Sequence, residues 1–181
     1  EKISLGKEQS VCDLGFYFGT LGDNLEEFAK VQDKVMGLKI YLNQTTGGFV
    51  VNLESLPKIV EAWPKKLPIL FHAEEDIIVE ALTIAKNADQ RIHVCHVSSE
   101  SELSAILKIK ESYDKITCGV CPHHLFLTAE TAEKLGGFGR MKPELKHQSD
   151  VDFMWSHLAD IDIIESDHAP HTIEEKESGN V

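Results

Sequence analysis

Short apolar runs alternate with amphipathic helical patterns along most of this chain. Six of these runs read as strands, at residues 11–18, 38–42, 67–72, 91–97, 115–121 and 161–165. Five of them are followed by a helical pattern, and this alternation predicts βα units with a parallel sheet. A complete eight-stranded barrel needs about 250 residues. Six strands in 181 residues therefore predict an incomplete α/β barrel, in a single domain over residues 1–181.

Capping residues mark the starts of several connecting helices. Ser99 followed by Glu102 predicts a capping box, in which each residue's side chain bonds the other's backbone N–H. Thr128 and Ser149 are the expected N-caps of two further helices. The charged residues 174–180 are expected to form a loop without structure of its own.

The composition argues against some classes of binding partner and indicates a cellular compartment. A net charge of −12 argues against nucleic acid or an anionic membrane surface as the main partner. No stretch approaches the roughly 18 apolar residues of a membrane span, and the first ten residues lack the apolar core of a signal peptide. Cys95, Cys118 and Cys121 lie inside strand-like runs, which favours reduced thiols in a cytoplasmic protein.

Polar side chains occur at or near strand ends, where an apolar residue would be expected. They are Lys39, His72, His96 and Asp167. His72 and His96 lie one βα unit apart, so in a barrel they can converge on one metal ion, although single core histidines are also common. Asp167 would supply a carboxylate ligand and a base that takes a proton from metal-bound water.

Lys39 lies between Leu38 and Ile40, in a strand expected to be buried on both faces. A buried ammonium is costly unless it is paired or chemically altered. One explanation is an ion pair with a strand-end glutamate such as Glu74. The other is a carbamate, which forms when the neutral amine adds carbon dioxide and which can bridge two cations. Burial favours the neutral amine and hence the carbamate.

The last predicted strand leads into an acid and two imidazoles. Asp167, His168 and His171 lie within five residues, and Pro170 restricts the backbone between them. These side chains can bind a metal, move a proton or hold a carboxylate. The same residues could also form an ordinary polar turn.

A second group combines two cysteines with two histidines. Cys118 and Cys121 have C-x-x-C spacing, and His123 and His124 follow at once, which could indicate a structural zinc knuckle. However, the sequence has no second C-x-x-C pair, and this pair lies in a strand rather than a turn. We therefore expect the two histidines to shape the mouth of the barrel.

Five motifs together resemble one family. They are GLKIYLN at residues 37–43, FHAE at 71–74, VCHV at 94–97, CPHHL at 121–125 and SDHAPHT at 166–172. Their order and spacing resemble dihydroorotases of the amidohydrolase superfamily over nearly the whole chain. The resemblance is greatest to the type that is fused into the multifunctional pyrimidine-synthesis protein of animals.

The resemblance implies a (β/α)8 TIM barrel with two divalent metal ions, most often zinc. This chain would contain about strands 3–8 of that barrel. Lys39 would be the N6-carboxylated lysine that bridges the two metals. His72 and His96 would bind the second metal, and Asp167 would be the catalytic aspartate that also binds the first metal.

The resemblance also implies the substrate and the reaction. Dihydroorotases interconvert N-carbamoyl-L-aspartate and L-dihydroorotate in pyrimidine biosynthesis, through a hydroxide that bridges the metals. His171 would hold the substrate's carboxylate, and Thr45 would contact substrate from a mobile loop at residues 44–48. The expected partners are this small molecule, a second subunit in a homodimer, or other enzymes of pyrimidine synthesis, without nucleic acid or membrane.

Some parts of the family pattern have no counterpart in the chain. The first barrel strand with its His-x-His metal ligands, the second strand and the closing segment are not matched, so we expect the chain alone to be inactive. Lys142 stands where the animal enzyme has arginine. Two alternatives remain open: a hydantoinase or allantoinase with the same metal chemistry, and a dihydroorotase-like scaffold without catalysis.

Overall fold

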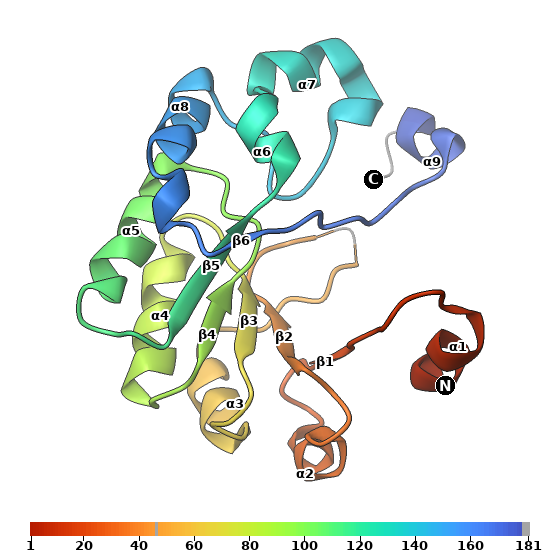
Figure 1. Ribbon diagram of the computed structural model, residues 1–181, viewed down its shortest axis with the longest axis vertical. Coiled ribbons are helices and arrows are strands. Elements are labelled where there is room, and N and C mark those ends of the chain that lie inside the picture. The colour runs from red at the N-terminus through yellow and green to blue at the C-terminus, as the bar shows by residue number, and fades with distance from the viewer. Residues whose placement is uncertain (46, 179–181) are drawn as a thin grey trace.

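The computed structural model describes residues 1–45 and 47–178, and its centre is one sheet of six strands. The strands stand side by side in chain order, and every neighbouring pair is parallel (Figure 1). They are β1 (Tyr17–Gly19), β2 (Gly37–Tyr41), β3 (Ile69–His72), β4 (Ile92–Val94), β5 (Ile116–Val120) and β6 (Ile163–Ile164). The expected α/β class is confirmed, and chain-order parallel strands are the arrangement of a partial barrel.

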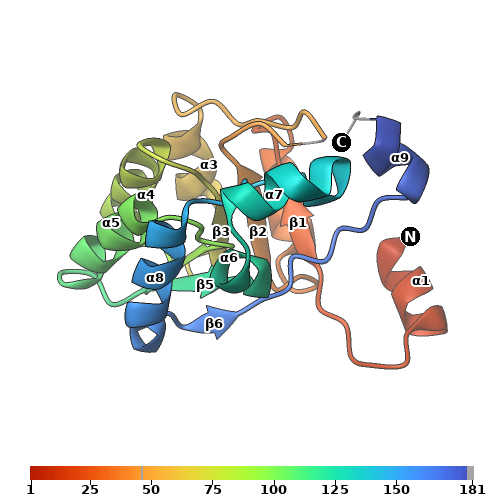
Figure 2. The same cartoon turned by 90° about the horizontal axis from the view of Figure 1, so that it is seen from above.

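A row of helices covers one face of this sheet (Figures 1 and 2). The row is α3 (Leu56–Ala62), α4 (Ile77–Asn87), α5 (Glu100–Lys110) and α8 (Gln148–Ser156), and each helix packs against the next. Apolar side chains from strands and helices meet between the two layers and are removed from water, which stabilises the fold. The largest of these buried side chains include Leu38, Ile40, Phe71, Leu56, Ile78 and Leu103.

Shorter helices fill the connections. α6 (Pro122–Phe126), α7 (Ala129–Leu135) and the 3-10 helix η2 (Gly136–Gly139) follow β5, and α9 (Ile173–Ser178) packs against η2. The others are α1 (Lys2–Gln9), η1 (Leu25–Glu27), α2 (Phe28–Val31) and η3 (Leu158–Asp160). No helix in residues 1–45 and 47–178 is both long and apolar enough to span a membrane.

The cap predictions succeed at two helices and fail at one. At α5 the Ser99 side chain accepts from the Glu102 N–H at 3.3 Å, and the Glu102 carboxylate accepts from the Ser99 N–H at 3.2 Å. Thr128 is the N-cap of α7, as expected. The prediction of Ser149 as a cap is wrong, because the carbonyl of His147 already accepts from the Asp150 N–H at 3.0 Å and the helix begins there.

Two predicted segments differ from the structure. Residues 11–16 are not a strand, because β1 pairs with β2 only from Tyr17 to Gly19, and Val11 is fully exposed. The expected loop at 174–180 is wrong as far as residue 178, and the last two residues lie outside the described part. Thr172 and Glu175 exchange side-chain-to-backbone hydrogen bonds of 2.8 and 3.2 Å, and this capping box begins α9.

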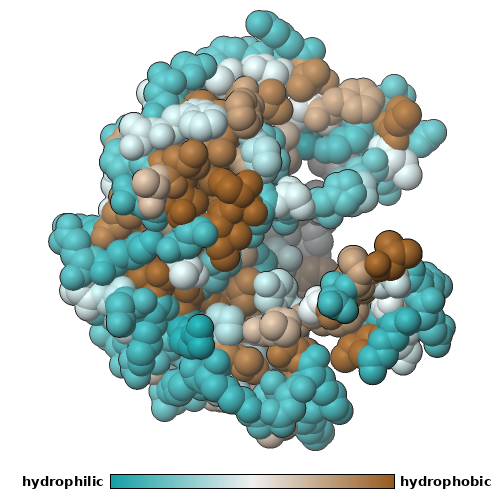
Figure 3. Space-filling model, in the orientation of Figure 1, coloured by the Kyte–Doolittle hydropathy of each residue, from teal (hydrophilic) through white to brown (hydrophobic). Residues whose placement is uncertain are grey.

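The sheet is open between its first and last strands. β1 and β6 stand at opposite edges, and within the described residues neither has a second neighbour. Figure 3 shows a deep hollow in the molecule on this side, between the part that contains α1 and the part that contains α9. The carboxyl ends of the strands therefore line a space that solvent can reach.

Candidate metal centre

Of the polar residues predicted at or near strand ends, His72, His96 and Asp167 lie at the carboxyl edge of the sheet. Lys39 lies in the middle of β2, in register with Leu70, so its placement at a strand end is wrong. Lys39 is in β2, His72 is the last residue of β3, His96 follows β4, and Asp167 follows β6. Parallel strands place their carboxyl ends at one edge, so side chains far apart in sequence come together there.

His72 and His96 are in direct contact. His72 Nδ1 lies 2.9 Å from His96 Nε2, and the ring centroids are 4.6 Å apart. Both side chains are buried. His72 Nε2 lies 3.2 Å from a carboxylate oxygen of Glu74, an arrangement that fixes the orientation and tautomer of an imidazole. The two histidines therefore lie together, as expected, while their binding of one metal ion stays a prediction.

The backbone and surroundings of His96 are unusual. His96 has φ 39°, a left-handed conformation that is uncommon for a side chain of this size, and its N–H donates to the Glu165 carboxylate. Its Nδ1 is buried and has no hydrogen-bond partner in the described part of the chain. Burial, with the nearby charges of Lys39 and His72, lowers the pKa of His96 to about 2, so the ring stays neutral and keeps a lone pair for a metal.

Lys39 reaches the same region but forms no direct ion pair. Among residues 1–45 and 47–178 its ammonium makes no hydrogen bond, it lies 5.2 Å from the centre of the Tyr41 ring, and its charge helps to lower the pKa of Glu165. The alternative that Lys39 pairs with Glu74 is wrong, because the Glu74 carboxylate bonds His72 instead. The side chain is only half-buried, so solvent at the hollow reduces the cost of its charge.

One cavity of about 920 Å³ brings the predicted site residues together. Its lining includes all six of them: Lys39, Thr45, His72, His96, Asp167 and His171. His168 is not among the lining residues and is exposed. Of the expected mobile loop, Thr46 lies outside the described residues.

Asp167 and His171 reach the cavity from the segment after β6. Asp167 is exposed and has φ 44°, which is also left-handed. His171 Nδ1 lies 3.6 Å from a carboxylate oxygen of Glu175 on α9. The alternative of an ordinary polar turn therefore fits the backbone of this segment. The side chains of Asp167 and His171 nevertheless line the same cavity as the two buried histidines.

The cavity wall also carries basic side chains, which favour an anionic ligand. Apart from Lys39 they are Arg140, Lys142 and Lys176. Lys142 Nζ lies 2.7 Å from a carboxylate oxygen of Glu144, so part of this positive charge is neutralised.

Two carboxylates that support the histidines were not predicted as site residues. Burial alone would raise the pKa of Glu74, but the hydrogen bond with His72 and the charges of His72, Lys146 and Lys142 lower it overall. The pKa of Glu165 is likewise lowered, because bonds with His93 and the His96 N–H outweigh burial. Glu74 could have been found from its position two residues after His72. Glu165 had no such signal, because it is 69 residues from His96.

The donor set fits the metals that the family resemblance implies. Imidazole nitrogens and carboxylates are common zinc ligands, and their partners usually hold the ring orientation as Glu74 does. Two buried imidazoles with nitrogens 2.9 Å apart, one of which also has an unpartnered nitrogen, form a site that a cation would complete.

Curated proteins similar in sequence to this chain are named as dihydroorotases and as multifunctional proteins. No protein-family model matches the chain. The multifunctional protein CAD of Squalus acanthias is 38% identical over 169 residues, which cover 92% of this chain and 8% of that protein. A dihydroorotase of Pyrococcus horikoshii is 35% identical over 156 residues, which cover 78% of this chain and 36% of that enzyme.

Solved structures share the fold. The L-hydantoinase of Arthrobacter aurescens has a TM-score of 0.84 and 24% identity, over 92% of this chain and 46% of that one. An inactive dihydroorotase-like domain of a CAD-like protein from Chaetomium thermophilum has a TM-score of 0.76 and 24% identity, over 90% of this chain and 46% of that one. The chain thus spans less than half of each of these relatives. By sequence, the chain is a dihydroorotase-like segment of the kind found in CAD-type multifunctional proteins.

Proposed function

We propose that this chain forms the metal-binding half of a dihydroorotase active site, which interconverts N-carbamoyl-L-aspartate and L-dihydroorotate. The observation behind the proposal is the cavity that gathers Lys39, His72, His96, Asp167 and His171 from four strands and the segments that follow them. The two proteins compared above as sequence relatives are named as a dihydroorotase and as CAD, which supports this reaction over other cyclic-amide hydrolyses.

The residues have separate roles in this proposal. His72 and His96, with a carboxylated Lys39 and Asp167, would hold two divalent ions of the zinc type. When bound, the ions would polarise the ring amide carbonyl and activate water. Asp167 accepts the proton of the attacking water and donates it to the ring nitrogen as the C–N bond breaks; ring closure runs the same steps in reverse.

The other cavity residues would bind the substrate. His171 and the basic side chains on the wall would hold the substrate's carboxylate, and Thr45 would contact it from the loop after β2. The multifunctional relatives support a polypeptide that also carries other pyrimidine-synthesis enzymes. A cytoplasmic location would fit the free thiols of Cys95, Cys118 and Cys121. Residues 1–181 would form part of a single barrel domain.

The test compares Asp167→Asn with the parent sequence in the full-length protein that carries this chain. We expect loss of dihydroorotate hydrolysis by several orders of magnitude, because the amide cannot accept the proton, while metal content measured by mass spectrometry falls little. Turnover retained in the variant would remove Asp167 from proton transfer.

Substrate identity is tested in the same protein with dihydroorotate, hydantoin and allantoin. We expect turnover of dihydroorotate alone. Turnover of hydantoin without dihydroorotate would assign the cavity to a hydantoinase, and an intact, metal-loaded protein that turns over none of the three would indicate a non-catalytic domain.

A further inference from the structure

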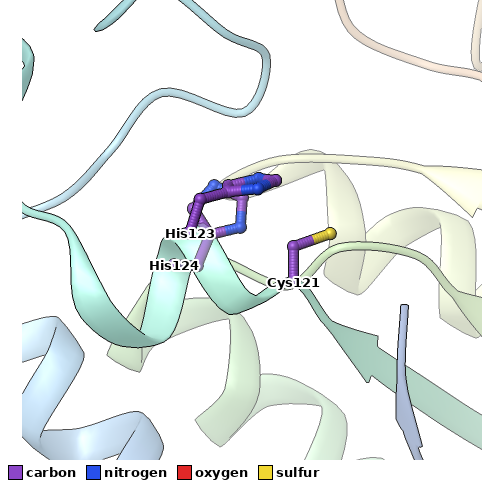
Figure 4. Close-up of side chains that lie close together, drawn as sticks. All are labelled: Cys121, His123 and His124. Carbon is purple, nitrogen blue, oxygen red and sulfur yellow. The ribbon is translucent and has the colours of Figure 1, made fainter. Parts of the chain in front are cut away.

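We propose that Cys121, His123 and His124 form a second cation site, suited to a zinc-class divalent ion and separate from the pair His72 and His96. The three residues lie where β5 passes into α6. In Figure 4 their side chains extend to the same side of this junction. One ligand atom from each lies within 4.8 Å of the other two.

Local structure explains why the three side chains meet. Cys121 is the N-cap of α6 and has an extended backbone, and Pro122 begins the helix. His123 and His124 then occupy its first turn, with ring centroids 4.4 Å apart. Cys121 and His124 are buried, whereas His123 is half-buried and lines the cavity.

The hydrogen bonding of His124 is the second observation. Its Nε2 lies 3.2 Å from the carbonyl oxygen of Pro143 and must donate, because a carbonyl can only accept. The proton is therefore on Nε2, and Nδ1 carries a lone pair. Nδ1 is buried and has no partner in the described residues. A buried acceptor without a partner destabilises the fold, and a metal–nitrogen bond would remove that cost.

This arrangement is the usual one around a metal-bound histidine. A carbonyl that accepts from one ring nitrogen fixes the tautomer and directs the other nitrogen at the ion. One thiolate with two imidazoles is a zinc-type ligand set. Ligands of tetrahedral zinc lie roughly 3.3–3.6 Å from one another, given metal–ligand distances near 2.0–2.3 Å. Side-chain movements would bring ligand atoms that now lie within 4.8 Å of one another to that spacing, with water as the fourth ligand on the cavity side.

Metal binding at this site would release the proton of the Cys121 thiol. Burial, with the negative charges of Glu165 and Asp167, raises the pKa of the Cys121 thiol to about 12, so the thiol is protonated when the site is empty. An arriving divalent ion displaces that proton, which leaves to solvent, and forms the sulfur–metal bond.

Neighbouring groups are less suited to the same role. Cys118 is buried in β5 and is not among the three ligands, so the structure groups cysteine and histidine differently from a C-x-x-C knuckle. His93, Cys95 and Glu165 also lie within 4.8 Å of one another. In that group Glu165 is already engaged with His93 and with the His96 N–H, so no buried nitrogen is left without a partner.

The test uses Co²⁺ as a spectroscopic probe in the full-length protein that carries this chain, stripped of metal with a chelator under reducing conditions. We expect a near-ultraviolet thiolate-to-cobalt charge-transfer band that saturates on titration. The band should be absent in Cys121→Ser and unchanged in Cys118→Ser, a control at a cysteine that is equally buried. His123→Gln, at a half-buried position that tolerates change, should weaken cobalt binding about tenfold or more.

Three outcomes would overturn the proposal: no band in the folded parent protein, a band that persists in Cys121→Ser, or a band lost only in Cys95→Ser. None of these depends on catalysis. Lys39, His72, His96 and Asp167 contain no sulfur, so their cobalt complex gives no such band, and the result stays separate from the test of dihydroorotase activity.

Discussion

Gly119 and Glu165 form a matched pair inside the barrel, on the inner side of β5. Gly119 has no side chain, and the Glu165 carboxylate occupies the place that a Cβ at this position would take. From there Glu165 accepts from the His96 N–H and faces His93, with 3.7 Å between His93 Nε2 and Glu165 Oε2. One carboxylate thus supports the left-handed backbone of a proposed metal ligand.

We predict that Gly119→Ala destabilises the protein by about 1–3 kcal/mol, because the added methyl group overlaps the Glu165 carboxylate. The same substitution in a Glu165→Ala background should cost about 1 kcal/mol or less, because the carboxylate is gone. Urea unfolding of the two single variants and the double variant gives the coupling free energy. Equal costs of Gly119→Ala in both backgrounds would contradict this pairing.

The pair His93 and Glu165 predicts a pH dependence of stability. Burial alone would lower the pKa of His93, but bonds with Cys95 and Glu165 raise the pKa to about 9, against 6.5 for the unperturbed group. Because the folded-state pKa is the higher one, the stabilisation is complete below about pH 6.5 and is lost as the pH rises through about 9.

The measurement compares the parent protein with His93→Gln by urea unfolding, near pH 6 and near pH 9.5. The free-energy difference between them should shrink on the order of 2 kcal/mol at the higher pH. A difference that is the same at both values would mean that His93 is not protonated in the folded protein.

At the scale of elements, strands and the site could be predicted because one pattern specifies both. A buried parallel strand needs apolar residues throughout, so a lysine or histidine within the strand or just after it stands out, as Lys39, His72 and His96 do. Elements without such a pattern were missed or misplaced. α9 depends on a capping box in a charged segment, and β1 is short because a strand exists only where a neighbour pairs with it.

The start of α5 is held by one carboxylate that also reaches another element. Glu102 is buried, and its oxygens accept from the N–H groups of Ser98 and Ser99 and from that of Glu75, before α4. We predict that Glu102→Gln lowers the free energy of unfolding on the order of 2 kcal/mol, because an amide puts donors where the carboxylate accepts.

The matched control for this prediction is Glu100→Gln, in the same first turn but exposed, which should cost less than about 0.5 kcal/mol. Both are measured by thermal and urea unfolding. Similar costs for the two variants would show that the bonds to the start of α5 contribute little.

At the scale of the whole molecule, the sequence predicted that polar side chains from several strands meet at one place. It did not predict the hydrogen bonds that hold those side chains in position. Strand-end residues meet because a parallel sheet aligns its carboxyl ends, whatever the details of packing. The bond from the His96 N–H to Glu165 joins residues 69 positions apart, and the free nitrogen of His124 depends on a carbonyl at Pro143. Such contacts follow from the folded arrangement of several elements and have no local sequence signal.

The open sheet predicts how the 181-residue chain behaves by itself. β6 pairs only with β5 among the described residues, and Ile164 at this edge is 58% exposed. An edge strand with unpaired backbone groups and exposed apolar side chains is a template for another chain. We therefore expect self-association, seen by light scattering as an apparent mass that rises with concentration.

Ile164→Lys should reduce this association, because a charge at an edge strand opposes pairing with a second copy. Val11→Lys is the matched control: Val11 is also apolar and fully exposed, but it lies outside the sheet. Far-ultraviolet circular dichroism should be the same for both variants. If Val11→Lys reduces association as much as Ile164→Lys, the cause is general surface hydrophobicity, and the open edge beside β6 is not the contact surface.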